Sequence, residues 1–511
     1  MKSKGKKSAV NFCTAVLYKI IVIAVGLLLP KLFISNYGSE INGLQTSVKQ
    51  IFTYIALLEA GVGASTLQSL YKPVAQKNRE QVNGYLSAAS SYYNKIGVLY
   101  FIALFIIAAI YSFAVDVDST TRLEVLFYIV ASGALTGLNF FYVAKIKLLI
   151  SAEGDQYLVS LVTTAVYVVS SIAKIILVYY GIHIIFVELA YLFINITATM
   201  VYYFVAKRKY PWLNFKSKPD FSCTEQKNSV LVHRISSVIF QNVDIMILTF
   251  VCDLRTVSIY SMYKMVVGMV TSIVSEIGGS VNFAFGQKFN LESDENKPQY
   301  RLTIDTFNVY YSAIAFALYN VTFLLILPFL ELYTDGMDIN YIYKLLPFLY
   351  VAMEFLMVGR EAMMRTIEVA GHFKKTQNKT ITETVINVVA SLIFTFVFKE
   401  KFGMAAGIYG VLLGTVVALL YRTVDINIYA NRKILNRGSG KTFFVMLVNM
   451  ALFAALFFVF ENINLRFDNY FDFVLNASWI TPMILLLYLS VHSLLNRKEF
   501  MKIYSTIKKN K

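Results

Sequence analysis

The stretch NFCTAVLYKIIVIAVGLLLPKLFI, residues 11–34, is an almost unbroken apolar run, and Lys19 lies near its middle. As an α-helix, the run is long enough to cross the roughly 30 Å hydrocarbon core of a bilayer. A charge at that depth costs at least about 2.5 kcal/mol, so an intramembrane lysine is expected to face a polar cavity rather than lipid. The stretch therefore predicts a membrane-spanning helix that carries a functional cation.

The whole chain shares this apolar character. Its 511 residues are 57% hydrophobic and only 15% charged, which is too apolar for a soluble globule. Apolar segments of about twenty residues recur along the chain, which favours helices over a β-barrel, whose segments are near ten residues. The net charge of +16 resides in short loops, so it indicates membrane orientation and not nucleic-acid binding. We expect an all-α polytopic membrane protein.

Hydropathy predicts fourteen spans, and the loop charges test that number. With a cytoplasmic N-terminus, 31 Lys and Arg residues fall on the cytoplasmic side and 7 on the opposite side, a strong positive-inside bias. Both termini are then cytoplasmic, and the first apolar run is an uncleaved span and not a signal peptide. The predicted spans are residues 9–34, 43–71, 92–115, 121–150, 157–180, 182–206, 225–251, 255–286, 301–330, 340–369, 376–398, 404–430, 441–461 and 473–495.

The second half of the chain repeats the charge pattern of the first. Lys19 and Arg234 are 215 residues apart, and so are Lys49 and Lys264. We expect two related six-helix lobes, 1–206 and 225–435, joined by a basic cytoplasmic linker, 207–224. Residues 436–511 then hold two extra spans and a basic tail. Transporters built from such repeats bind substrate at the midplane between the repeats.

Two segments carry a family resemblance. LLEAGVGASTLQSLYKPVAQKNREQVNGYL, Leu57 to Leu86, resembles the second span and following loop of bacterial Wzx-type polysaccharide-unit flippases. Ala370 to Arg422 resembles their eleventh and twelfth spans, including the pattern Gly407, Gly410, Gly414 and Thr415. Weaker similarity begins at Ala152 and at Tyr260. These patterns identify the superfamily, which also contains MATE-type drug exporters and MurJ-type lipid II flippases, better than they identify the cargo.

The resemblance implies a V-shaped, twelve-helix core with a central cavity that opens alternately to each side. It implies a flippase, not an enzyme, in the bacterial cytoplasmic (inner) membrane. The cargo would be a polyprenyl-(pyro)phosphate-linked oligosaccharide on an undecaprenyl-type carrier, used for O-antigen, capsule or exopolysaccharide. Implied partners are this lipid-linked oligosaccharide, membrane lipid, a Na⁺ or H⁺ counter-ion and polysaccharide polymerase machinery.

Intramembrane cations are the candidate binding residues, because a phosphate or pyrophosphate head needs counter-charges inside a bilayer. The alternative is that each cation forms an internal ion pair, such as Arg234 with Asp244 or Lys19 with Glu59. The candidates for a cationic cavity are Lys19, Arg234, Lys264, Lys49, Lys174 and Arg360. We expect Arg360 to meet another helix or the cavity, since Glu354 is six residues away and poorly placed to pair with it.

Four intramembrane carboxylates are candidates for ion coupling, because transporters build proton and cation sites from such groups. They are Glu59, Asp244, Glu276 and Glu383. The alternative, which we favour, is that neighbouring cations neutralise them. The three cysteines and four histidines show no zinc spacing, so we expect no metal site and no cofactor.

Two other functions compete with the flippase. A MATE-type cation-coupled multidrug exporter would line its cavity with carboxylates and aromatic residues, and the matched cations of this chain argue against it. A membrane glycan polymerase or ligase would need a sizeable outer loop for its catalytic residues, whereas the predicted outer loops are short and collect no catalytic constellation.

Overall fold

The apolar periodicity of the chain produces helices throughout the computed structural model. The structure describes residues 2–509 except 60–61, 116, 119, 225–226, 280–284, 286–288, 290–297 and 462–464. All regular elements among the described residues are helical, as expected for backbone that must satisfy its hydrogen bonds inside a bilayer. The chain divides into unit 1, Met1–Ser258, and unit 2, Ile259–Lys511.

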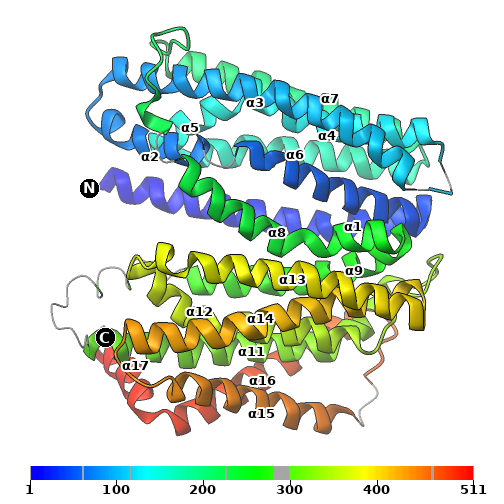
Figure 1. Ribbon diagram of the computed structural model, residues 1–511, viewed down its shortest axis with the longest axis vertical. Coiled ribbons are helices and arrows are strands. Elements are labelled where there is room, and N and C mark those ends of the chain that lie inside the picture. The colour runs from blue at the N-terminus through cyan, green and yellow to red at the C-terminus, as the bar shows by residue number, and fades with distance from the viewer. Residues whose placement is uncertain are drawn as a thin grey trace. The chain divides into compact units, whose positions relative to one another are not determined.

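Unit 1 contains the first eight helices (Figure 1). These are α1 (Lys2–Ile55), α2 (Val62–Ala75), α3 (Arg79–Ala114), α4 (Arg122–Tyr142), α5 (Ala144–Ala152), α6 (Gln156–Tyr179), α7 (Ile184–Lys209) and α8 (Lys227–Val251). Within α1, Gly38 has φ 84° and ψ 168°, a conformation that side chains disfavour and glycine adopts freely. The chain reverses there, so α1 holds the first predicted span and the first part of the second, which continues through the 3₁₀ helix Ala56–Glu59 into α2 (Figure 1).

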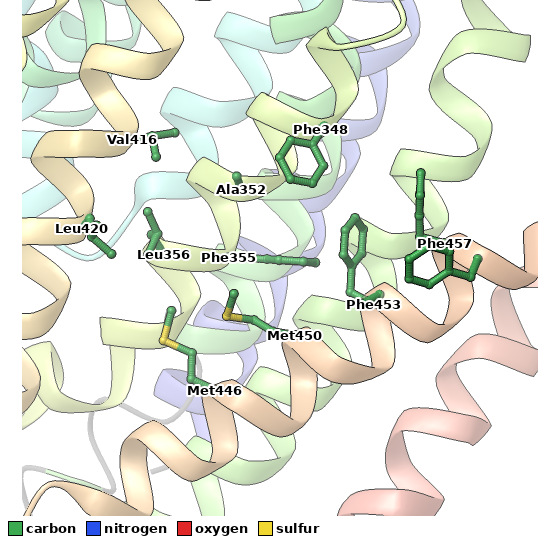
Figure 2. A pocket seen from close by; sticks show the side chains of 12 residues that line it. Phe348, Ala352, Phe355, Leu356, Val416, Leu420, Met446, Met450, Phe453 and Phe457 are labelled. Carbon is green, nitrogen blue, oxygen red and sulfur yellow. The ribbon is translucent and has the colours of Figure 1, made fainter. Parts of the chain in front are cut away.

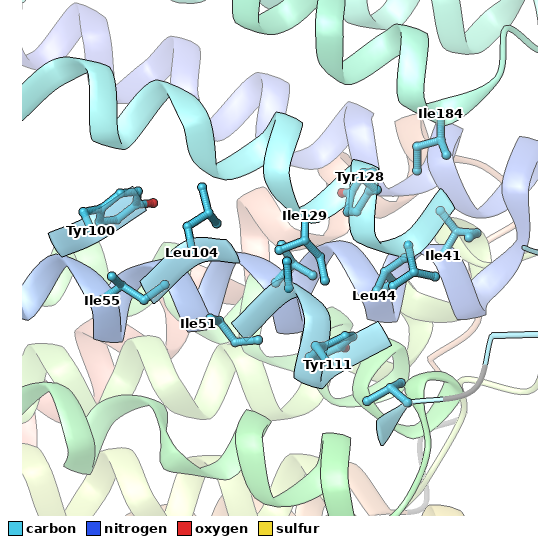
Figure 3. Close-up of a cluster of buried hydrophobic side chains, with 14 of the residues drawn as sticks. Ile41, Leu44, Ile51, Ile55, Tyr100, Leu104, Tyr111, Tyr128, Ile129 and Ile184 are labelled. Atoms are coloured by element: carbon cyan, nitrogen blue, oxygen red, sulfur yellow. The ribbon is translucent and has the colours of Figure 1, made fainter. Parts of the chain in front are cut away.

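The core of unit 1 forms where α1 meets α3 and α4. Figure 3 shows Ile51 and Ile55 of α1 beside Leu104 of α3 and Ile129 of α4, all of them buried. Two buried glycines of α4 allow this close packing, because a Cβ on Gly133 would lie 2.6 Å from Leu104. Burial of these side chains fixes how the α1 to α4 helices are arranged.

The 207–224 segment, predicted as a linker between lobes, packs on α3 within unit 1. Asn83 donates to the carbonyl of Trp212 at 3.2 Å and accepts from the amide of Asn214 at 3.0 Å. Cys223 is buried at the end of the segment, and burial raises the pKa of its thiol to about 11. The 207–224 segment therefore packs on unit 1 through specific hydrogen bonds, and its Cys223 thiol is unreactive.

Helix α8 packs on α1 within unit 1, and the predicted lobe boundaries stay a prediction. Its Thr249 donates to Ser47 of α1 at 2.8 Å, and Asn42 donates to Ser258 at 2.8 Å. Helix α1 also lies close to the helix that follows α8, because a Cβ on Gly43 would lie 1.8 Å from the carbonyl oxygen of Leu254. The division at Ser258 falls inside α9 (Leu254–Gly279), which continues into unit 2.

Unit 2 is built around α11 (Pro298–Tyr333), which is buried along most of its length. Helices α12 (Leu346–Val369), α15 (Gly440–Glu461), α16 (Tyr470–Leu495) and α17 (Arg497–Lys509) contact α11. Helices α13 (Phe373–Phe402) and α14 (Gly407–Lys433) form a closely packed pair beside α12. The two predicted extra spans, α15 and α16, therefore pack into unit 2 through α11.

Eleven helices among the described residues are long and apolar enough to cross a membrane, which shows a multi-pass membrane protein. The number of fourteen spans stays a prediction. The difference arises at three places. Helix α1 holds the first predicted span and part of the second, the described apolar stretch of α8 is Val238–Val251, and α12 carries Glu354, Arg360 and Glu361 in its apolar stretch.

Candidate functional site

Unit 1 contains a buried ion pair between the adjacent helices α6 and α7. Lys174 Nζ lies 2.5 Å from Glu188 Oε1, and both side chains are about 95% buried. The rings of Phe33 and Tyr191 flank the ammonium at 5.4 Å and 4.8 Å. The candidate Lys174 is thus paired with a carboxylate, which neutralises most of its charge.

Two other candidate cations of unit 1 lie on α1 with exposed side chains, Lys19 and Lys49. Lys49 is close enough to Lys174 and Glu188 to interact electrostatically with both. We call Lys49, Lys174 and Glu188 the unit 1 charge cluster. It holds two cations and one carboxylate, so one positive charge is uncompensated within it.

The predicted match between the two halves stays a prediction. Arg234 lies on α8, but its side chain falls outside the described residues. Lys264 is half-buried on α9, with its ammonium 5.5 Å from the ring of Tyr260. Two candidate carboxylates lie nearby in the sequence, Asp244 buried on α8 and Glu276 exposed on α9.

Unit 2 contains a larger network of buried charges between α12, α13 and α14. Arg360 donates to Glu383 Oε1 at 2.5 Å, and Arg422 Nε lies 3.5 Å from Glu383 Oε2. Arg422 is 1% exposed. Arg360 therefore contacts α13, and two arginines lie against the Glu383 carboxylate.

Arg422 extends the network to a second carboxylate. Its Nη1 donates to Asp425 Oδ2 at 2.7 Å, its Nη2 donates to Thr380 at 3.0 Å, and Lys379 also pairs with Asp425. We call Arg360, Lys379, Glu383, Arg422 and Asp425 the unit 2 charge cluster. Three cations face two carboxylates, so this cluster also carries one uncompensated positive charge.

Of the two arginines in the unit 2 charge cluster, Arg360 is the more accessible. Its side chain is 13% exposed, against 1% for Arg422. Its second terminal nitrogen contacts only the sulfur of Met357, at 3.0 Å. A weak thioether acceptor leaves guanidinium donors available for a stronger anion. Arg360 can therefore bind an oxyanion while it keeps its bond to Glu383.

Sequence reasoning did not select the intramembrane carboxylate of Glu354, although hydropathy placed it inside a span. Tyr319 of α11 donates to Glu354 Oε2 at 2.8 Å, and Thr271 of α9 donates to Oε1 at 3.0 Å. Among the described residues, no Lys or Arg pairs with this carboxylate. A carboxylate held by hydroxyl groups alone is suited to bind a proton or a small cation.

Glu59 has a related environment in unit 1. It ends the short 3₁₀ helix Ala56–Glu59 that interrupts the second predicted span, and Tyr93 of α3 donates to it at 3.0 Å. Gly63 permits this contact, since a Cβ there would lie 2.7 Å from Glu59 Oε1.

Within the part of the chain that the structure describes, no three His, Cys, Asp or Glu side chains gather to hold a metal.

An apolar groove of about 450 Å³ lies on unit 2 between α12, α14 and α15 (Figure 2). Phe355 of α12 and Leu420 of α14 line one side, and Met446, Met450 and Phe453 of α15 line the other. Its surface is almost wholly apolar, so it suits a hydrocarbon chain.

Solved structures share this arrangement of helices. Lipid II flippase MurJ in an inward closed conformation matches with a TM-score of 0.64 and 13% identity, over 94% of this chain and 98% of that chain. The chain has the MurJ/MATE fold. An inward-facing multidrug resistance MATE transporter of the MOP superfamily matches with a TM-score of 0.57 and 14% identity, over 82% of this chain and 98% of that one.

A MATE structure in the bent conformation shows the MurJ/MATE fold again, with a TM-score of 0.51 and 15% identity over 86% of this chain and 98% of that one. No protein-family model and no curated protein sequence matches the chain. The prediction of an all-helical MATE/MurJ-like fold is confirmed. At these identities, the MurJ/MATE fold is what the likeness establishes, and the cargo is a separate question.

Proposed function

We propose that this protein is a flippase that moves polyprenyl-(pyro)phosphate-linked oligosaccharide units across the cytoplasmic membrane by alternating access. The observation that carries the proposal is the excess of cations over carboxylates in both the unit 1 and unit 2 charge clusters. Uncompensated charge inside a membrane protein is costly, and an anionic head group would offset that cost.

The groove of unit 2 supports a lipid-linked cargo. Its apolar lining offers a polyprenyl tail contacts along α15. Burial of hydrocarbon contributes about 0.8 kcal/mol per CH₂ when the reference is water. Transfer of the tail from lipid into the groove gains less free energy than transfer from water. The groove therefore orients the tail and adds little binding affinity. The two kinds of site together match a molecule with an acidic head and a long apolar tail.

Replacing Lys49 with Gln tests the role of the unit 1 charge cluster. The side chain is exposed, so the fold should survive, while one counter-charge for the phosphate is removed. We expect the flipping rate of a fluorescent polyprenyl-pyrophosphate oligosaccharide in proteoliposomes to fall about tenfold, the loss of roughly one charge-assisted hydrogen bond.

Lys95→Gln is the matched control, because Lys95 is an exposed lysine on α3 and should change the rate by less than about twofold. Equal flipping by Lys49→Gln and wild-type protein, at equal reconstituted amounts, would reject the counter-charge role.

The Glu354 site is the specific observation in favour of a cation-coupled exporter of the MATE type. In that case, everted vesicles should expel ethidium in a Na⁺- or H⁺-dependent manner, and Glu354→Gln should abolish the efflux, since an amide cannot take up a proton or hold Na⁺ by charge. We expect no ethidium efflux from wild-type vesicles. Efflux that Glu354→Gln removes would overturn the flippase proposal.

A further inference from the structure

A second groove lies on unit 1, and its lining includes no residue of the unit 1 charge cluster. It has a volume of about 450 Å³ and forms between the α4–α5 junction, α7 and the 207–224 segment. Apart from Lys145 and Thr199, its lining is aliphatic or aromatic, and Tyr142, Met200 and Phe204 that line it are each more than half exposed. Because these helices span a membrane, exposed apolar side chains of this kind face lipid.

Lys145 is the charged residue of the lining that the structure describes. Its ammonium donates to Ser90 Oγ at 3.0 Å and lies 4.9 Å from the ring centroid of Phe215. No carboxylate pairs with it among the described residues. An ammonium has three donors, so two remain for a ligand. A half-buried cation in the lining of an apolar groove is suited to bind an anion that carries a hydrocarbon chain.

The position of Lys145 along its predicted span indicates that the groove faces the cytoplasmic leaflet. Lys145 and Lys147 fall at the cytoplasmic end of their predicted span, on the side that holds 31 of the loop and tail cations. The neighbouring end of α7 carries Lys207, Arg208 and Lys209. Basic pockets between helices on the cytoplasmic side attract acidic lipid head groups, and that leaflet is the one with negative surface potential.

We propose that an anionic phospholipid of the cytoplasmic leaflet binds in this groove, with one acyl chain along α7 and its phosphate on Lys145. The lipid supplies the counter-charge that the protein does not, and its chain covers exposed aromatic surface of α7 and the 207–224 segment. A zwitterionic lipid would bring its own cation next to Lys145 and is expected to bind more weakly. This site is independent of the proposed cargo and its route.

The test is native mass spectrometry of the full-length protein, titrated with phosphatidylglycerol or phosphatidylcholine. Wild-type protein should retain phosphatidylglycerol in preference to phosphatidylcholine. Lys145→Gln should weaken phosphatidylglycerol binding about tenfold and remove the preference for it over phosphatidylcholine. Lys145→Arg should retain the affinity and the preference.

Lys147→Gln is the matched control. Lys147 lies two residues away, stacks 5.1 Å from the ring of Tyr202, also lacks a carboxylate partner and does not line the groove. It should change phosphatidylglycerol binding by less than about twofold. Met200→Trp fills the groove and should weaken both lipids, which tests the site even if Lys145→Gln fails to fold.

Three results would overturn the proposal. One is unchanged phosphatidylglycerol binding in both Lys145→Gln and Met200→Trp. Another is equal binding of the two phospholipids by wild-type protein. The third is displacement of phosphatidylglycerol by polyprenyl phosphate at much lower concentration, which would assign the groove to the cargo.

Discussion

Glu383→Leu is expected to lower the free energy of unfolding by about 3 to 5 kcal/mol, the cost of breaking a buried ion pair by removing one partner. Leucine would leave Arg422, which is 1% exposed, with Asp425 alone, and Arg360 without any carboxylate. The measurement is the denaturation midpoint of the purified protein in detergent, followed by the amount that remains monodisperse. Flipping should be lost together with folded protein.

Lys379→Gln provides the control within the same cluster. The Lys379 side chain is 38% exposed and Asp425 keeps Arg422 as a partner, so the loss should be less than about 1 kcal/mol. If Glu383→Leu denatured at the same point as Lys379→Gln, the unit 2 charge cluster would not be what holds α12, α13 and α14 together.

Gly414→Ala is expected to destabilise the protein by about 3 kcal/mol, at the upper end of the usual cost of overpacking. The added Cβ would lie 2.3 Å from the backbone nitrogen of Ser391, and backbone cannot rotate away as a flexible side chain can. The α13 and α14 helices would have to separate. That separation would stretch the 2.8 Å bond from Asn387 to Thr415. Midpoint temperatures of variant and wild type in one detergent measure the effect.

Gly268→Ala makes the same chemical change in a helix where nothing lies within 4 Å of the new Cβ. Alanine there should be neutral or stabilising by about 0.5 to 1 kcal/mol, because glycine loses more backbone freedom on folding. A Gly414→Ala protein as stable as Gly268→Ala would show that the close approach of α13 and α14 is not required.

The sequence predicted those features that depend on local composition. Helix positions followed from apolar runs, and the glycines of α14 were singled out through the resemblance to polysaccharide-unit flippases. The distance of Arg360 from Glu354 along α12 indicated only that the two do not pair, which is a property of helix geometry; the partner on α13 did not follow from it.

Features that depend on how helices align could not be predicted. Lys174 and Glu188 meet because α6 and α7 return beside each other, and their contact depends on where that turn places each residue. Glu354 is held by Tyr319 and Thr271 from two other helices, and no spacing along the chain connects the three. The packing of α8 on α1 likewise depends on contacts between residues far apart in the sequence, such as Thr249 with Ser47.

The two units are connected by α9, which runs from Leu254 to Gly279 through the division at Ser258. A continuous helix transmits bending and twisting, which a flexible loop does not, because backbone hydrogen bonds stabilise each turn. A movement of one unit against the other must therefore bend α9 or move its first turn together with unit 2. A glycine pair introduced near Ser258 would soften the connection and uncouple events in one half from the other.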